Sequence, residues 1–206
     1  MVTTYTPTKT AQTDLLIWQD RVSGDYVEGT AFDCSGIIGL GFFTLKIGRL
    51  TGTAFTAGSP NIRVEASPAS SGEQWVPIYS YQPGVGVATI AATTANGAIA
   101  ANAGTFVLAS GSNIAVGNLL FLGHTTTPAN YELITVKSGT TTVTPVHNVI
   151  NAHDTGCVIT NQAEWVGFTI DLSPFFRIRA VVDNLNSGQG FKVELKLSTE
   201  TNIIGT

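Results

Sequence analysis

The sequence predicts an all-β protein: a jelly-roll-like antiparallel β-sandwich with an inserted small β-barrel or sandwich domain and an extended N-terminal arm. Three observations lead to this prediction. Apolar and polar residues alternate with period two over several stretches, which is the pattern of strands with one buried face. Turn-forming pairs such as Asn96-Gly97 and Ser138-Gly139 separate short β-branched segments. No convincing helix appears, because the segment from Asp14 to Arg21 fits a strand as well as a helix with an N-cap at Asp14.

The outer sandwich is expected to comprise about residues 15–83 and 162–206. Its alternation is clearest in the segments 43–47, 61–66, 166–172, 176–182 and 191–197. Residues 184–190 are rich in Asn, Ser and Gly and predict a turn that joins the last two strands as a hairpin, with one apolar face on a core and one charged face in solvent. Within the strand Trp75–Tyr81, Pro77 indicates an edge position or a bulge.

The middle of the chain, residues 84–161, has a different composition. Its residues are smaller and more polar, and its only charged side chains are Glu132, Lys137 and Asp154. Short strand candidates follow one another at close spacing, which predicts a compact small barrel or sandwich inserted into the outer one. The alternative is one long meander with a glycine-rich loop region.

The first fourteen residues, Met1 to Asp14, are rich in Thr and show no apolar period. They predict an extended arm, which must lie on something if it is to be ordered. The residues expected to contact a partner through this arm are Thr3, Tyr5, Pro7 and Thr8.

The composition excludes several classes of protein. Charged residues make up 12% of the 206, against about 25% in ordinary soluble domains, while 43% are apolar and the mean hydropathy is +0.23. This is not the composition of a disordered chain, and no apolar stretch approaches the ~20 residues that cross a bilayer. The net charge of −4 and the scattered Lys and Arg disfavour nucleic-acid binding. The low charge indicates either a surface covered by other subunits or one whose polarity comes from Thr, Ser, Asn and Gly.

Metal sites are weakly indicated. His147 and His153 lie six residues apart, next to Asp154, but this spacing matches no known zinc pattern, and the favoured interpretation is that His153 ties down a turn. A calcium site is a second weak candidate, in the short acidic loop region formed by Asp25, Glu28 and Asp33.

Catalytic and redox motifs do not stand out either. The acids mostly occupy polar strand faces and turns, and there is no Gly-x-Ser-x-Gly elbow or phosphate-binding glycine motif. We therefore expect no enzyme activity and no cofactor. The two cysteines, Cys34 and Cys157, are far apart, and two buried thiols are favoured over a disulfide.

Three aromatic residues suggest a ligand face. Trp75, Tyr79 and Tyr81 have the same parity, so in an unbroken strand they line one face, as in a carbohydrate-binding platform. Core positions are favoured for these residues over a platform.

Two stretches carry a family resemblance. The first runs from Ile62-Arg63-Val64-Glu65-Ala66-Ser67 to Trp75-Val76-Pro77-Ile78 and, with Phe175–Arg179 and Phe191–Leu195, resembles the β-sandwich of many tailed-phage structural proteins. Other jelly-roll binding modules show a looser likeness. The second runs from Val116–Leu122 through Glu132–Val136 and Thr141–Thr144 to Ala152-His153-Asp154-Thr155-Gly156 and is similar to small β-domains of phage virion proteins.

The resemblance implies a non-enzymatic virion component, similar to capsid decoration (cement) proteins, and no catalytic residues carry over from that class. It implies that the protein binds and stabilises major capsid protein subunits on the outer capsid surface, as a homotrimer made in the host cytoplasm. The alternative is a carbohydrate-binding or adhesin-type module, including a tail or baseplate component. A β-sandwich hydrolase is a third hypothesis, which requires a convergent pair of acids.

Overall fold

The computed structural model describes residues 6–9, 12–49, 60–84, 92–161, 163–185 and 190–203. These residues form three antiparallel sheets, and the only helical element among them is a 3-10 turn, η1 (Pro128–Asn130). The predicted all-β fold class is confirmed. The segment around Asp14 to Arg21, for which a helix had to be considered, is a strand.

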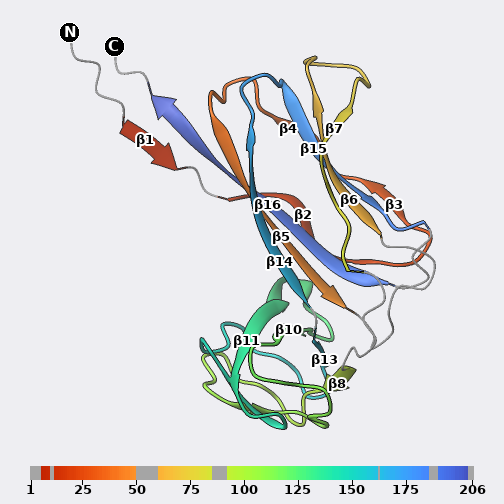
Figure 1. Ribbon diagram of the computed structural model, residues 1–206, viewed down its shortest axis with the longest axis vertical. Coiled ribbons are helices and arrows are strands. Elements are labelled where there is room, and N and C mark those ends of the chain that lie inside the picture. The colour runs from red at the N-terminus through yellow and green to blue at the C-terminus, as the bar shows by residue number, and fades with distance from the viewer. Residues whose placement is uncertain are drawn as a thin grey trace.

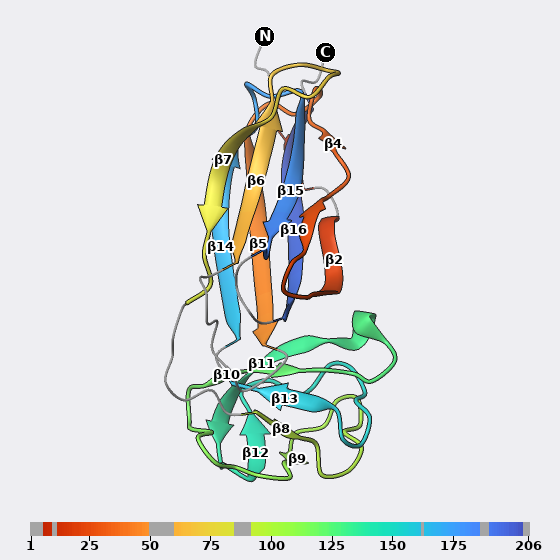
Figure 2. The ribbon, with the colours of Figure 1, turned by 90° about the vertical axis from the view of Figure 1, so that its right-hand side faces the viewer.

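Two of the sheets form a sandwich (Figures 1 and 2). The first contains, in spatial order, β2 (Thr13–Arg21), β16 (Phe191–Ile203), β5 (Leu40–Arg49) and β14 (Glu164–Asp171). The second contains β3 (Tyr26–Glu28) and β4 (Phe32–Asp33), which both pair with β15 (Arg177–Asp183), followed by β6 (Asn61–Ser67) and β7 (Val76–Tyr81).

The predicted hairpin of the last two strands is wrong, because β15 and β16 lie in different sheets. The strand pairs of the sandwich are instead nested. The first strand, β2, pairs with the last, β16, and β3 with β4 pairs with β15, the last but one. Inside these pairs lie β5 with β14 and, innermost, β6 with β7. A chain that pairs in this way is one long hairpin rolled into two facing sheets. This topology is the jelly roll, which has eight strands here when β3 and β4 are counted as one.

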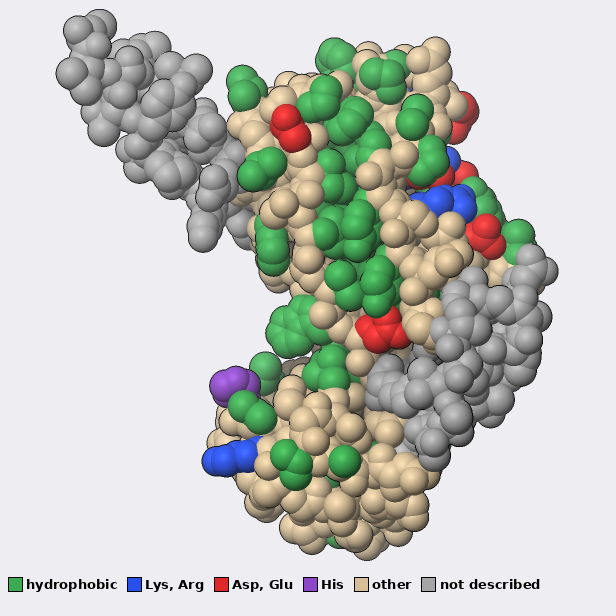
Figure 3. Space-filling view, viewed as in Figure 1, with side chains coloured by type: hydrophobic (Ala, Val, Ile, Leu, Met, Phe, Trp, Pro, Cys, Tyr) green, Lys and Arg blue, Asp and Glu red, His purple; other side chains and the backbone are tan. Residues whose placement is uncertain are grey.

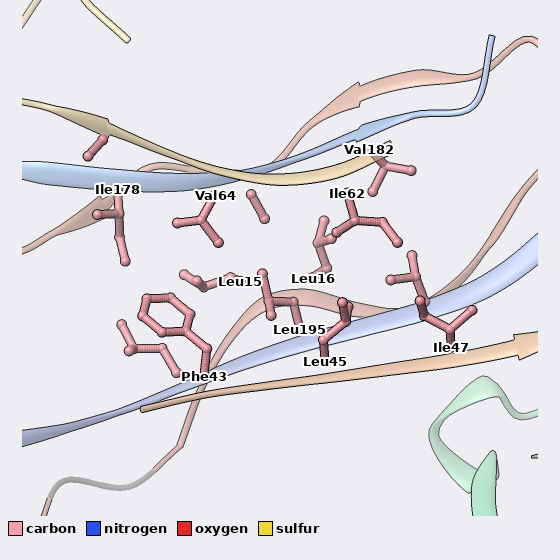
Figure 4. Close-up of a cluster of buried hydrophobic side chains, with 14 of the residues drawn as sticks. Leu15, Leu16, Phe43, Leu45, Ile47, Ile62, Val64, Ile178, Val182 and Leu195 are labelled. Carbon is pink, nitrogen blue, oxygen red and sulfur yellow. The ribbon is translucent and has the colours of Figure 1, made fainter. Parts of the chain in front are cut away.

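The sandwich core follows the period-two pattern of its strands. Phe43, Leu45 and Ile47 of β5 point between the sheets and meet Ile62 and Val64 of β6 (Figure 4). All five are at most 2% exposed, and each such burial contributes about 1.5–3 kcal/mol. The residues that the alternation predicted to face inward on these strands are therefore the ones that form the core.

The third sheet is built from residues 92–160, which lie between β7 and β14 in the chain. Its spatial order is β8 (Ala92–Thr94), β13 (Val158–Thr160), β10 (Leu119–Leu122), β11 (Glu132–Ser138), β12 (Thr142–Pro145) and β9 (Phe106–Val107). It encloses a separate cluster of buried apolar residues and lies at one end of the sandwich (Figure 2). The expected domain boundaries at residues 14, 83 and 161 stay a prediction.

The remaining strand, β1 (Thr6–Lys9), extends the other end of the molecule. It pairs with the last residues of β16, from Thr6 opposite Ile203 to Lys9 opposite Glu200. The pairing of β16 with β5 ends earlier, at Thr199 opposite Gly41. We call the two-stranded segment of residues 6–9 and 200–203 the terminal ribbon. It extends away from the sandwich, at the end opposite the third sheet (Figure 1).

Candidate functional site

An aromatic cluster joins the sandwich to the third sheet. Trp18 of β2 packs against Phe121 of β10, with ring centroids 5.7 Å apart, and against Tyr131 at 6.0 Å. Phe121 and Tyr131 meet edge to face at 5.4 Å, and Ala163 completes the buried cluster. Such aromatic pairs contribute about 0.5–1.5 kcal/mol beyond the area they bury.

Gly48 of β5 makes room for this junction. A Cβ atom at Gly48 would lie 2.5 Å from Cγ of Phe121, a distance that real Cβ atoms essentially never show. The absence of a side chain at this one position therefore lets the third sheet lie close to the sandwich. The sequence pattern did not identify Gly48, because its partner Phe121 is far away in the chain.

Lys192 of β16 is buried against the same cluster. Its Nζ donates a hydrogen bond of 3.0 Å to the hydroxyl of Tyr131 and lies 4.7 Å from the centre of that ring. Burial disfavours the charged ammonium and lowers the pKa of Lys192 below its usual 10.5.

This pKa shift predicts a pH dependence of stability. Between the lowered pKa of the folded state and about 10.5, the unfolded chain binds more protons than the native protein, so stability rises with pH. We expect the change in the free energy of unfolding from pH 8 to pH 10 to be more positive for the native protein than for Lys192→Met, whose flexible side chain has similar length. The two buried thiols lower stability over this range equally in both proteins. Urea unfolding of both proteins measures the difference. An equal change in both would show that Lys192 does not carry the effect.

A groove runs along the outside of the junction. It consists of two hollows of about 440 and 240 Å³ that share Trp18, Ala129, Glu194 and Lys196. The larger hollow reaches Asp14, Ile17 and Pro128, and the smaller one reaches Lys46, Trp165, Ile150 and Asn151. The outline of the molecule narrows between the sandwich and the third sheet (Figure 3). We call this feature the junction groove.

The charged side chains of the junction groove compensate one another. Oε1 of Glu194 forms an ion pair with Nζ of Lys46 at 2.9 Å, and its Oε2 lies 3.5 Å from Nζ of Lys196, which is also 3.5 Å from Asp14. Two acids thus face two lysines in a chain of ion pairs.

Trp165 forms one wall of the groove and is exposed to solvent. Its side chain points outward from β14 and is 59% exposed, and Nζ of Lys46 lies over the ring at 5.5 Å from its centre. On the same outer face of the sheet, Phe42 is 48% exposed and its ring lies over Gly167, the next outward position on β14. Two exposed aromatic rings therefore follow each other along the sheet.

The structure does not bring Trp75, Tyr79 and Tyr81 onto one face. A register shift between Val64 and Glu65 interrupts the pairing of β6 with β7, so the parity of the strand changes within it. Tyr79 stacks on Phe168 of β14, with ring centroids 3.6 Å apart, and the hydroxyl of Tyr81 donates to Glu164.

Trp75 occupies the opposite, outer side of the second sheet. Its ring is covered by the guanidinium groups of Arg177 at 4.8 Å and Arg179 at 4.5 Å, and its indole N–H donates to Glu73. The flat row of three rings that a carbohydrate platform requires is therefore absent from β7. The irregularity that Pro77 indicated is present at this place, in the edge strand of the described sheet.

A buried hydrogen-bond network organises the third sheet around His153. The ring Nδ1 lies 2.7 Å from the carbonyl of Gly123, which can only accept, and Nε2 lies 2.7 Å from Oε1 of Glu132. Glu132 also accepts from the backbone N–H groups of Ile150 and Asn151, at 3.0 and 3.2 Å. His153 thus ties three loops together, which is the structural role that the sequence favoured.

The metal candidates do not assemble. Within the part of the chain that the structure describes, no group of three or more His, Cys, Asp or Glu side chains is arranged to hold a metal ion, and this includes His147 with Asp154 and the loop of Asp25, Glu28 and Asp33. Asp154 instead accepts from Thr125 and lies 3.2 Å from Nδ1 of His124, and these contacts lower its pKa.

The two cysteines are free and buried in separate clusters. Cys34 belongs to the sandwich core and Cys157 to the core of the third sheet. Burial raises the pKa of Cys34 to about 12 and that of Cys157 to about 11, so both thiols stay protonated at neutral pH. The interpretation as small apolar residues holds for both.

The predicted arm residues are partly described. Thr3 and Tyr5 lie outside the described residues. Pro7 and Thr8 belong to β1, where they lie opposite Asn202 and Thr201 of β16. The last two residues of the predicted arm, Thr13 and Asp14, belong instead to β2.

Comparison with known proteins gives no match: no family model fits the chain, and neither curated proteins nor solved structures show a similarity to it. Within the described residues, no helix has the length and hydropathy to cross a membrane.

Proposed function

We propose that this protein is a non-enzymatic structural protein of a tailed-phage virion, which decorates the outer capsid surface and clamps capsid subunits. The observation that carries the proposal is the terminal ribbon. Among the described strands, β1 pairs with β16 alone, and an isolated two-stranded pair is at best marginally stable in water. Residues 200–203 of β16 nevertheless continue beyond the sandwich with β1 as their partner strand.

A neighbouring subunit would supply the missing layer. Ordering a chain segment costs about 1–2 kcal/mol per residue in backbone entropy, and burial or strand addition on a partner offsets this. Major capsid protein subunits are the proposed partner because the resemblance to decoration proteins implies them. The ribbon lies at the end of the molecule opposite the third sheet (Figure 1). An attached protein would then hold its ribbon on the shell and project the third sheet outward.

The nested strand order supports the same proposal. The jelly roll is a frequent architecture of viral capsid domains, although it also occurs in lectins and cupins and so does not decide the function. The sparse charge fits a protein that buries surface in an assembly: on the face drawn in Figure 3, the third sheet shows very few charged side chains. A homotrimer is proposed because decoration proteins of the class that the sequence resembles commonly sit at local symmetry axes.

The carbohydrate-binding alternative is not proposed for β7, because Trp75 lies on the opposite side of the sheet from Tyr79. A tail or baseplate component would use the same ribbon and jelly roll. Binding to capsid shells separates that position from the one proposed.

Deletion of residues 1–11 tests the proposal. We expect the truncated protein to fold, because β2 begins at Thr13 and both cores are untouched, but to lose binding to shells of the major capsid protein from the same phage genome. Co-sedimentation measures the binding, and light scattering measures whether the mass is three times the 21.6 kDa of one chain. The control is Ile150→Ala, a change at an exposed residue far from the ribbon, which should bind as the native protein does. Full binding by the truncated protein would contradict the proposed clamp.

A further inference from the structure

We infer that the junction groove is a binding site for a neutral oligosaccharide, with the exposed ring of Trp165 as its stacking platform. This site goes beyond the proposed decoration function and does not depend on it. Three features of the groove support this inference: its aromatic wall, its balanced charges and its shape.

The aromatic wall offers the kind of surface that sugar rings bind. The faces of a pyranose carry C–H groups, which pack against the electron-rich face of an indole, and Trp combines this apolar face with a polar edge. Trp165 is 59% exposed on the outer face of the sheet, so its side chain does not belong to a core. Lys46 lies over part of the ring and helps to hold its orientation.

The charges of the groove exclude a strongly charged ligand. Lys46, Lys196, Glu194 and Asp14 pair with one another, so neither an anion nor a cation finds an uncompensated partner there. The same groups present carboxylate acceptors and ammonium donors side by side, and Asn151 adds an amide. Hydroxyl groups, which both donate and accept, match such a surface.

The shape of the groove indicates more than one sugar unit. Its two hollows adjoin each other, because Trp18 and Ala129 line both of them. Phe42 lies over Gly167, two residues along β14 from Trp165, which is a spacing of about 7 Å on the sheet. Trp165 and Phe42 thus extend the groove along the outer face of the sandwich.

The indole N–H signals of the protein give a direct test. The chain has three Trp residues, so a ¹⁵N-labelled sample gives three indole cross-peaks, of which Trp18 and Trp165 line the groove and Trp75 lies under two arginines elsewhere. The probes are cellohexaose, maltohexaose, laminarihexaose and xylohexaose, each titrated to 10 mM. We expect at least one of them to shift the Trp165 and Trp18 peaks saturably and to leave Trp75 unchanged.

Two variants complete the test. Trp165→Ala should weaken that binding about tenfold or more, and Phe176→Ala, which removes a 45% exposed ring away from the groove, should leave it unchanged. Light scattering should give the same mass for Trp165→Ala as for the native protein. The inference is overturned if no probe moves the groove peaks, if the Trp75 peak moves with them, if Trp165→Ala binds undiminished, or if this variant changes the oligomeric mass, which would make Trp165 a subunit contact.

Discussion

Glu132→Ala is expected to lower the free energy of unfolding by about 3–5 kcal/mol, because it leaves three buried polar groups without their partner and each costs about 1–3 kcal/mol when unsatisfied. Glu132 is 8% exposed and accepts hydrogen bonds from Ile150 and Asn151 while it faces Nε2 of His153. The alanine leaves the two backbone N–H groups without their acceptor, and Nε2 of His153 without its hydrogen-bond partner, inside the third sheet. Urea unfolding followed by Trp fluorescence measures the loss.

The histidines provide a matched control for this network. His153→Ala removes the same network from the other side and should destabilise the protein by a similar amount, whereas His147→Ala, at an exposed position, should change stability by about 0.5 kcal/mol or less. The double variant of Glu132 and His153 should lose less than the sum of the two single losses. Equal small effects of the two histidine variants would contradict the structural role assigned to His153.

Gly48→Ala is expected to destabilise the protein by about 3 kcal/mol, the upper part of the range for overpacking a core. The added methyl group would lie 2.5 Å from Cγ of Phe121, so either the ring or the third sheet must move. Because Phe121 contacts both Trp18 and Tyr131, the displacement also disturbs the aromatic cluster. Urea unfolding measures the effect on stability.

A double-mutant cycle shows whether the clash is with Phe121. Phe121→Ala alone costs about 3–5 kcal/mol as a large-to-small core change, but in the Gly48→Ala background it also relieves the clash and should cost clearly less. Gly104→Ala is the control glycine, because its added Cβ would make only an ordinary contact of 3.5 Å with Asn148. Strict additivity of the two changes would show that Gly48 acts in another way.

Alternation in the sequence identified the long strands of the sandwich, but it did not identify short strands such as β1, β3 and β4 or the arrangement of the sheets. Alternation along β5 and β16 identified core residues such as Phe43 and Leu195 because burial on a pleated strand has period two. The nested order of β2 with β16 and β5 with β14 depends on contacts between segments far apart in the chain, which periodicity does not encode.

The β7 aromatics show the same limit at a smaller scale. Trp75 and Tyr79 have equal parity in the sequence, but one irregular pairing opposite Val64 and Glu65 sends them to opposite sides of the sheet. A bulge of one residue moves every later side chain of the strand to the other face of the sheet. Pro77 indicated that the strand is irregular, but it did not show which side chains change face.

One part of the junction groove could have been predicted from the sequence. Trp165 shares its parity with Gly167, Thr169 and Asp171, the outward residues of β14, so its exposure could have been predicted from alternation alone. The hollow beside it could not, because it forms between β2, β16 and the loops of the third sheet. The same holds for Gly48, whose importance depends on where Phe121 lies.

The most direct test of the central proposal is an electron cryo-microscopy reconstruction of major capsid protein shells incubated with the purified protein. The proposal predicts added density on the outer surface, with the terminal ribbon against a capsid subunit and the third sheet at the far, solvent-exposed end. Shells without added density, or protein bound through the third sheet with the ribbon free, would contradict it.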